Sequence, residues 1–341
     1  MQCASSQWYS TSYAPLEATI ALNNKLWNYQ TTQRFKVCHH IENVTNCLLQ
    51  IPKSITSTSN PFVKHCVKLR HTSSYRHSHA SVLVVGSTLI REIYEFYNLK
   101  QEQEMPIECL FLLDKAKIPE AMCDIPGDRV YVSSLVMNKL SGVQSTESIE
   151  VIALMKMPKC FMNLSDNHFE VDDIRWFDRA STHRILVLEG IQDPGNLGTL
   201  LRSALAFRWN AVFLLPGCCD PFNEKALRAS RGAPFQLPLV SGNWTHLEAF
   251  SDEVQVKMLA AHPGSSNSLK PVHKLSQKLA HSLVHTPLCL ILGSEGSGLT
   301  EKAKKCCELV SIPMADHFES LNVAVAGGIF MFMLQSDLES P

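Results

Sequence analysis

The 341-residue chain lacks the patterns that mark several common classes of protein. Its twelve cysteines include no C-x-x-C pair, which argues against a structural zinc site because zinc ligands usually arrive in such pairs. The chain is too long and too poor in cysteine for a disulfide framework, so we expect reduced and mostly buried thiols. No apolar run reaches the roughly 18 residues of a membrane helix, so no membrane span is expected.

A large net charge of either sign is also absent, since 31 Lys+Arg stand against 32 Asp+Glu and leave a formal net charge of −1. This balance excludes a uniformly basic nucleic-acid binder. Only 18% of the residues are charged and 45% are hydrophobic, so the chain can bury a sizeable core and is not disordered throughout. The length predicts two domains and a tail.

Residues 1–52 contain no glycine and only two acids, Glu17 and Glu42. They hold nine Ser/Thr and three basic residues, and no apolar run of the kind that a secretory signal needs. This hydroxyl-rich, acid-poor composition is typical of an organelle transit peptide. It predicts a disordered leader over 1–52 and a location in the chloroplast or mitochondrion. The alternative is an untargeted disordered tail on a cytoplasmic protein.

Acidic residues are missing altogether from residues 53–91, which carry six Lys/Arg. Residues 92–182, by contrast, contain more acids than bases. The near-neutral total therefore hides one strongly basic segment.

Apolar runs and helical periodicities predict a small α/β domain over 53–160. One helix is expected at 61–70, where Asn60 and Pro61 supply a cap and a first-turn proline, and another at 90–97. A polar, acidic stretch predicts a linker over 161–182. Within 53–160 the expected strands are 81–86, 108–113, 129–132 and 151–155.

From residue 183 to 341, apolar strands without in–out alternation are separated by helices, which predicts a parallel sheet covered on both faces. Ligands bind at the carboxyl ends of such strands, which directs attention to the loops 189–197, 293–299 and 313–322. The expected strands are 185–188, 211–215, 235–240, 256–261, 288–292 and 309–312. The expected helices are 197–207, 224–230, 246–250, 300–307 and 323–334.

Glycine is concentrated in two of these loops, but not in the order of a nucleotide-binding fingerprint. Gly293, Gly296 and Gly298 run G-x-x-G-x-G, the reverse of the dinucleotide pattern, which disfavours a nicotinamide-dependent oxidoreductase. No G-x-x-x-x-G-K-[ST] sequence is present, so a P-loop NTPase is excluded. A G-x-S-x-G nucleophile elbow is absent as well.

Three segments, 189–202, 290–299 and 312–323, resemble in order and spacing the three sequence motifs of the SpoU (TrmH-like) family of RNA 2′-O-ribose methyltransferases. Residues 54–155 resemble the family's L30e-like N-terminal substrate-binding domain, through Ser59-Asn60-Pro61 and Lys139-Leu140-Ser141-Gly142. The resemblance implies a Rossmann-like parallel α/β sheet with a deep C-terminal trefoil knot over 183–341, preceded by the small α/β domain.

The resemblance also implies the reaction, which is transfer of a methyl group from S-adenosylmethionine to a ribose 2′-hydroxyl of structured RNA, either rRNA or tRNA. No metal is needed, because the sulfonium is already an activated leaving group. The second and third loops would hold the adenine in an apolar slot with a few backbone hydrogen bonds. The residues carried over to this role are Leu292, Gly293, Glu295, Gly296, Ile312, Pro313, Met314, Leu321 and Asn322.

The weakly acidic 2′-hydroxyl needs a group that takes or neutralises its proton. The family's motif-one arginine corresponds to Arg202, which we expect to grip the phosphate beside the ribose and orient the hydroxyl; whether it relays the proton stays open. Asn196 is expected to place the ribose, with a cap of the following helix as its alternative or additional role. Ser320 and Asn322 are expected to orient the substrate and the arginine. For Glu295 we expect contacts with backbone amides, and we favour a general-base role less.

In the family the N-terminal domain binds RNA, and the basic segment lies within it. Phosphate contacts supply position and salt-dependent affinity, and we expect them from Lys64, Lys68, Arg70 and Arg76.

The helix expected at 323–334 is apolar nearly all round and must be covered on all sides. In the family it helps to build a homodimer through the knot region. Asp316 departs from the family's usual glycine, which leaves the identity of the substrate open. The alternative function is a catalytically inactive RNA-binding protein of the same fold.

Overall fold

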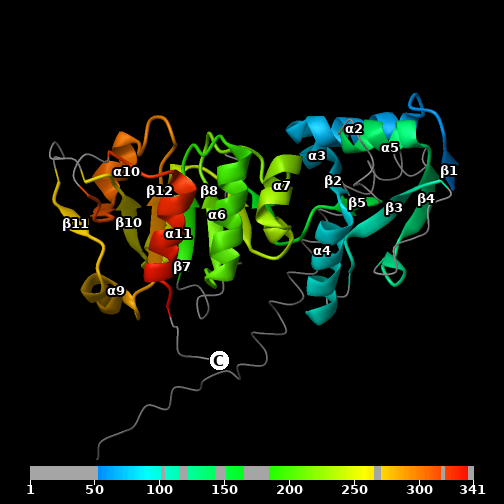
Figure 1. Cartoon of the computed structure of the whole chain (residues 1–341). Helices are drawn as coiled ribbons and strands as arrows, with labels where there is room; N and C mark the ends of the chain where they lie inside the picture. Colours follow the sequence, from blue (N-terminus) through cyan, green and yellow to red (C-terminus); the bar gives the residue numbers. More distant parts are fainter. Residues whose placement is uncertain are drawn as a thin grey trace, which may run out of the picture. The chain divides into compact units, whose positions relative to one another are not determined.

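The computed structural model describes residues 53–100, 104–114, 122–142, 151–164, 184–264, 270–315 and 319–336. The predicted leader at 1–52 and Asp316 lie outside these residues. The described residues contain two β-sheets, one within 53–156, called the N-terminal region, and one within 161–336, called the C-terminal region (Figure 1). No helix among the described residues is long and apolar enough to cross a membrane.

The sheet of the N-terminal region has five strands in the order β1-β4-β3-β5-β2. Strand β5 is antiparallel to β2 and β3, whereas β4 is parallel to β1 and β3. The strands are β1 (Ser54–Ile55), β2 (Ser81–Val85), β3 (Ile107–Leu113), β4 (Asp128–Val132) and β5 (Val151–Lys156). The sheet is thus mixed, and four of its strands lie where the sequence predicted strands, whereas β1 was not expected.

Helices of the N-terminal region begin where the sequence supplies caps. The side chain of Asn60 accepts the amide of Phe62 at the start of α2 (Pro61–His71), and Pro61 occupies the first turn. Ser133 caps α5 (Ser134–Ser141), whose end is marked by Gly142 in a left-handed conformation. The other helices of this region are α3 (Ser73–His79) and α4 (Ser87–Leu99).

The sheet of the C-terminal region has eight strands in the order β11-β13-β10-β12-β7-β8-β9-β6, and every pairing in it is parallel. Its central strands β7, β8 and β12 are completely buried, as expected for a sheet covered on both faces. The strands are β6 (Phe161–Asn163), β7 (Arg184–Leu188), β8 (Ala211–Leu214), β9 (Leu239–Ser241), β10 (Lys257–Ala261), β11 (Val272–Lys274), β12 (Leu288–Leu292) and β13 (Glu308–Ser311).

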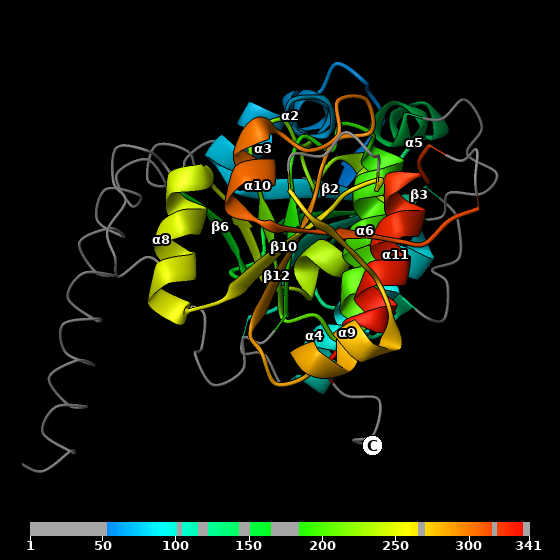
Figure 2. The same ribbon diagram turned by 90° about the vertical axis from the view of Figure 1, so that its left-hand side faces the viewer.

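Two apolar layers cover this sheet (Figure 2). Helices α6 (Pro194–Ala206), α9 (Gln277–Leu283) and α11 (Val323–Met333) contribute to one layer, with α6 and α11 side by side. Helices α8 (Trp244–Val254) and α10 (Glu301–Cys306) contribute to the other. Helix α7 (Glu224–Ser230) packs so closely on α6 that a Cβ atom at Gly198 would collide with the backbone of Ala226. That close approach explains the glycine two residues after Asn196.

The structure corrects several expected boundaries. Residues 161–163 were predicted to open the linker, but they form β6, which pairs with β9 at the edge of the sheet. The strand expected at 235–240 is shortened to β9, because Ala233–Phe235 form a turn of 3-10 helix. Strand β11 and helix α9 were not expected; the remaining linker residues from 165 onward lie outside the described residues.

Candidate active site

Helix α6 starts three residues earlier than predicted, and this changes the role of Asn196. Asp193 is the cap, because its carboxylate accepts the backbone amide of Asn196 at 2.8 Å, and Pro194 fills the first turn. The alternative prediction that Asn196 caps this helix is therefore wrong. The side chain of Asn196 is left for other contacts.

Those contacts join all three motif loops. The Asn196 Nδ2 group donates to Glu295 Oε1 at 3.0 Å, and Asn322 Nδ2 donates to Asn196 Oδ1 at 3.1 Å. Glu295 also accepts the backbone amide of Gln192, at 3.4 Å. The three predicted site residues thus form one hydrogen-bonded chain, although Asn196 lies 99 residues before Glu295 and 126 before Asn322 in the sequence.

Asn322 has a second role at the start of α11. Its Oδ1 atom accepts the backbone amides of Ala324 at 2.9 Å and Val325 at 3.3 Å, so it caps the helix while its Nδ2 group reaches Asn196. The orientation of the Asn322 amide is therefore fixed from both ends.

The environment of Glu295 keeps it ionised. Burial by itself would raise the pKa of this carboxyl, but the hydrogen bond from Asn196 and backbone amides, including that of Gln192, outweigh it and lower the pKa. A carboxylate held in this way is a poor acceptor of a further proton, and we therefore assign Glu295 to bracing the loops.

A cavity of about 690 Å³ lies at the carboxyl ends of β12, β13 and β10. Its walls combine apolar side chains, such as Leu292, Ile312 and Phe330, with the glycine-rich turn that follows β12. A Cβ atom at Gly293 would collide with the backbone of Gly298, so this turn closes only with glycine. All the predicted cofactor residues except Pro313 line the cavity. An apolar slot with exposed backbone groups fits an adenine nucleoside.

Sequence reasoning missed one wall of this cavity. Ala261 ends β10, His262 and Pro263 follow it, and Lys304 lies on α10. Strand β10 sits between β12 and β13, so its carboxyl end faces the same cavity. The adjacency of these strands, which is not visible in the sequence order, was the missing signal.

Sequence reasoning also missed a buried carboxylate behind the cavity. Glu189, 5% exposed at the end of β7, accepts Trp244 Nε1 at 2.7 Å, Thr300 Oγ1 at 2.8 Å and the Thr300 backbone amide at 3.2 Å. Thr300 caps α10 directly after the loop 293–299. Glu189 therefore fixes the point at which the cofactor loop returns to the sheet.

The remaining predicted catalytic residues are placed differently. Ser320 lines the cavity beside Leu321. Arg202 lies on the exposed side of α6 and forms no hydrogen bond or ion pair within the described part of the chain. The structure thus joins Asn196, Glu295 and Asn322 but leaves Arg202 outside their network. No group of His, Cys, Asp or Glu suited to a metal ion occurs among the described residues.

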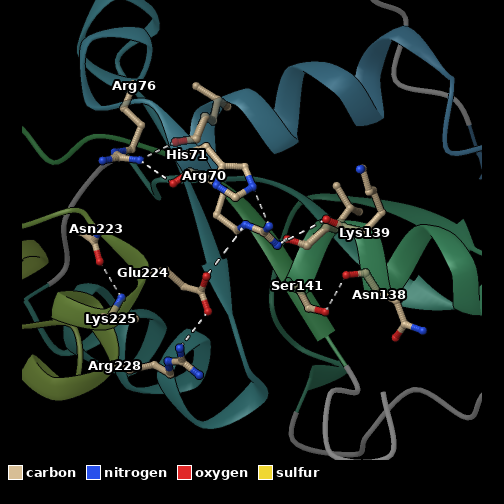
Figure 3. A network of polar contacts seen from close by, with 12 residues as sticks. Arg70, His71, Arg76, Asn138, Lys139, Ser141, Asn223, Glu224, Lys225 and Arg228 are labelled. Carbon is tan, nitrogen blue, oxygen red and sulfur yellow. Dashed lines mark hydrogen bonds and ion pairs between the residues drawn. The ribbon is translucent and has the colours of Figure 1, made fainter. Parts of the chain in front are cut away.

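The four predicted RNA-binding residues divide into two pairs. Lys64 and Lys68 are exposed on α2. Arg70 instead turns inward: its Nη1 group donates to the Leu140 carbonyl at 2.7 Å, and its Nε atom lies 3.9 Å from Glu224 of α7 (Figure 3).

Arg76 is the clearest correction, because its residue is only 2% exposed. Its guanidinium donates to Asp220 Oδ2 from Nε at 2.9 Å and from Nη2 at 2.5 Å, and from Nη1 to the carbonyls of Leu69 and Arg70. An RNA phosphate cannot reach this guanidinium, so the prediction that Arg76 binds RNA is not supported.

Asp220 follows β8, so its pair with Arg76 joins the two regions within one compact unit. Burial would raise the pKa of Asp220, but the neighbouring His77, the charge of Arg76 and the hydrogen bonds from Ser73 and Arg76 outweigh burial and hold the pKa well below its usual range. Asp220 is therefore an ionised, paired carboxylate at neutral pH.

The chain is similar to proteins that are already known. Residues 183–332 match the model of the SpoU rRNA Methylase family. The 23S rRNA (guanosine(2553)-2′-O)-methyltransferase RlmP of Bacillus subtilis is 28% identical over 284 residues, which make up 83% of this chain and 99% of that protein. The 23S rRNA (guanosine-2′-O-)-methyltransferase RlmB of Vibrio parahaemolyticus is 30% identical over 183 residues, 53% of this chain and 68% of that protein.

A solved structure confirms the fold. The AdoMet-bound rRNA methyltransferase from Sinorhizobium meliloti superposes with a TM-score of 0.65 over 84% of this chain and 99% of that chain, at 22% identity. The parallel α/β fold predicted from the sequence is thereby confirmed. Together with the matched motifs, these likenesses show that the chain belongs to the SpoU rRNA methylase family.

Proposed function

We propose that this protein is an S-adenosylmethionine-dependent RNA 2′-O-methyltransferase. The observation that carries the proposal is the hydrogen-bonded chain of Glu295, Asn196 and Asn322, which joins the three motif loops at the rim of the cavity. The named relatives RlmP and RlmB methylate 2′-O positions of 23S rRNA, which makes ribosomal RNA the first substrate to test.

S-adenosylmethionine supplies an activated methyl group, and the residues of the cavity fit the rest of that molecule. Leu292, Ile312 and Leu321 offer the apolar contacts, and the turn at Gly293 and Gly296 exposes backbone groups for hydrogen bonds. Glu189 behind the cavity and Glu295 at its rim hold the loop in place. These residues bind and orient the cofactor.

The ribose is handled at the rim. Asn196 and Ser320 present amide and hydroxyl groups that can fix the ribose hydroxyl, while Asn322 keeps the Asn196 side chain in one orientation. Arg202 is an exposed and unpaired cation on α6, free to grip the adjacent phosphate and bring the 2′-oxygen into line. Orientation of this kind can contribute several powers of ten to the rate.

The homodimer belongs to the same proposal, because α11 leaves an apolar face uncovered. Val325 is 52% exposed and Phe332 is 49% exposed, and with Ile329 they line an open hollow of about 630 Å³ beside Thr199 of α6. A second copy of this chain would cover that face, as the family resemblance implies. Sedimentation should show a dimer for the wild type and a monomer for Phe332→Lys. The same change at Leu135, 71% exposed on α5, is the matched control and should leave the dimer intact.

Two further parts of the proposal rest on sequence. The trefoil knot and the L30e-like nature of the N-terminal region are carried from the family resemblance. Targeting to a chloroplast or mitochondrion rests on the composition of residues 1–52. Fusion of these residues to a fluorescent protein tests the targeting, and a diffuse cytoplasmic signal would contradict it.

The function is tested by mapping 2′-O-methyl groups in total RNA from cells with and without the protein, and by transfer of labelled methyl groups to RNA from the deficient cells. We expect one or a few rRNA positions to lose the mark and to regain it in vitro. Calorimetry with S-adenosylhomocysteine separates the alternative, since an inactive RNA-binding protein of this fold would show no binding. Absence of both binding and transfer would overturn the proposal.

A further inference from the structure

Helices α2 and α3 present two faces of different character. On the inner face, Arg70 donates to an α5 carbonyl and lies near Glu224, and Arg76 donates to backbone carbonyls of α2 (Figure 3). Arg76 also donates to Asp220 of the C-terminal region. The outer face carries rings and lysines. The buried pair between Arg76 and Asp220 thus joins α3 to the C-terminal region, and Arg76 also bonds to α2.

Three rings form a continuous cluster on the outer face. The Tyr75 and His79 rings have centroids 3.9 Å apart at an interplanar angle of 35°, and the His65 ring lies 5.3 Å from His79 and 5.6 Å from Tyr75. His65 Nδ1 is 2.9 Å from the Tyr75 hydroxyl, and His79 Nδ1 is 3.0 Å from the Tyr75 carbonyl. His65 and Tyr75 are half-buried while His79 is exposed, so His79 is the outermost ring.

Two cations border the rings. The Lys68 ammonium lies 4.1 Å from the centroid of the Tyr75 ring, and Lys64 is exposed one turn earlier on α2. Neither lysine forms an ion pair with a carboxylate of any described residue, and residues 53–91 contain no acid. Burial and the nearby His79 lower the pKa of His65, which favours the uncharged form of this ring.

We propose that His65, Tyr75 and His79 form a platform on which an unpaired base of the RNA substrate stacks against His79, with Lys64 and Lys68 holding the neighbouring phosphates. The proposal rests on the function proposed above and names the structural class of RNA that it requires, namely single-stranded loops or ends. The three rings and the two lysines together are named the stacking platform.

The chemistry of the platform fits a nucleotide better than the other ligands of a basic surface. Every base has a π face that can stack on an aromatic ring. A ring that is packed against other rings and lies next to lysines can therefore bind the base, while the lysines bind the phosphates. A base-paired duplex hides the faces of its bases and would use only the lysines. An acidic protein segment would use the lysines as well, and has no need of three adjoining rings.

The platform is tested with the full chain by fluorescence anisotropy, using labelled oligouridylate, a duplex RNA of the same length and poly-glutamate as probes. His79→Leu keeps an apolar side chain but removes the ring, and we expect its affinity for oligouridylate to fall about tenfold at every salt concentration. His79→Phe should retain the affinity, because phenylalanine also presents an aromatic ring on which a base can stack. Lys68→Gln should reduce the slope of log affinity against log salt by about 0.7.

Helix α9 offers matched controls, because His281 and Lys278 are exposed on it. His281→Leu and Lys278→Gln should leave affinity and slope unchanged. Binding of S-adenosylhomocysteine should be unchanged in all of these variants.

Three results would overturn the platform: wild-type affinity of His79→Leu for oligouridylate, an equal loss for duplex and single strand, or binding of poly-glutamate as tight as that of oligouridylate. The last would instead identify an acidic protein partner. Failure of the proposed function is distinguishable, since it would appear in the wild type as absence of methyl transfer and of S-adenosylhomocysteine binding.

Discussion

The molecule contains two polar networks of opposite construction. In the C-terminal region, Asn196, Glu295 and Asn322 form an exposed chain of hydrogen bonds around an open cavity. Between the two regions, the side chains of Arg76 and Asp220 are 3% and 8% exposed and pair directly. One network consists mainly of neutral amides in contact with water, the other of two opposite charges removed from it.

This difference separates function from stability. An exposed hydrogen bond between amides contributes little net free energy, so its members can exchange partners with a substrate at low cost. A buried charge that loses its partner keeps the full cost of desolvation. We therefore expect a change at Asn196 in the first network to alter catalysis with little effect on unfolding, and changes in the second network to do the reverse.

Loss of one partner of the buried pair should have the largest effect. Arg76→Met leaves the Asp220 carboxylate buried without its guanidinium, and we expect the free energy of unfolding to fall by about 3–5 kcal/mol. The double variant Arg76→Met/Asp220→Leu, which buries no charge, should recover most of this loss. Denaturant unfolding measures both variants, and S-adenosylhomocysteine binding below the transition should stay at the wild-type level. A single variant within about 1 kcal/mol of the wild type would contradict the role of the pair.

For Arg202 we expect a loss of activity without a loss of stability. Arg202→Ala should lower the rate of methyl transfer about 100-fold or more, because the ribose hydroxyl loses the group that orients it. The free energy of unfolding and the affinity for S-adenosylhomocysteine should not change, since the side chain is exposed and unpaired. Single-turnover transfer to deficient RNA gives the rate. Arg91→Ala, on the exposed side of α4, is the matched control; wild-type activity of Arg202→Ala would remove Arg202 from the mechanism.

The two networks also differ in how far the sequence could predict them. The positions of the motif loops along the chain could be predicted, because each loop follows a recognisable apolar strand, although α6 begins three residues earlier than expected. Gly293 permits the turn, and Asn322 caps α11. The resemblance to the SpoU family supplied the rest, which composition and periodicity could not have done.

The basic segment shows where such prediction fails. Lys64, Lys68, Arg70 and Arg76 are alike in a sequence, since each is a cation on a helix without acids nearby. Whether a cation meets water or a carboxylate depends on Glu224 and Asp220, which lie about 150 residues further along the chain. Strand β6 was misread for the same reason, because its partner β9 is distant in the sequence.

Glu189 belongs to neither network. We expect its substitution to have a smaller effect than the changes at Arg76 and Arg202. Glu189→Gln keeps the size of the side chain but replaces one accepting oxygen with an amide that cannot accept from Trp244 or Thr300. We expect the KM for S-adenosylmethionine to rise about tenfold, because the exit of the loop 293–299 loosens, with kcat nearly unchanged. Trp244→Phe, which removes one donor and leaves Thr300 in place, should show a smaller rise. A fall in kcat without a rise in KM would contradict a role in positioning the cofactor loop.

The smallest expected effect is the change with pH in the contribution of Asp220 to the free energy of unfolding. It tests whether the buried network depends on charge. The pKa of Asp220 is below its usual value in the folded protein, so its contribution to stability is fully present above the unfolded pKa of about 4 and is lost as the pH falls below that value. Asp220→Asn cannot titrate, so the difference in unfolding free energy between wild type and this variant should be constant from pH 8 to 5 and shrink below about pH 4. Denaturant unfolding at a series of pH values measures this difference. A difference that stays constant at acid pH would show that the carboxylate gains nothing from Arg76, and the buried network would then differ from the exposed one in burial alone.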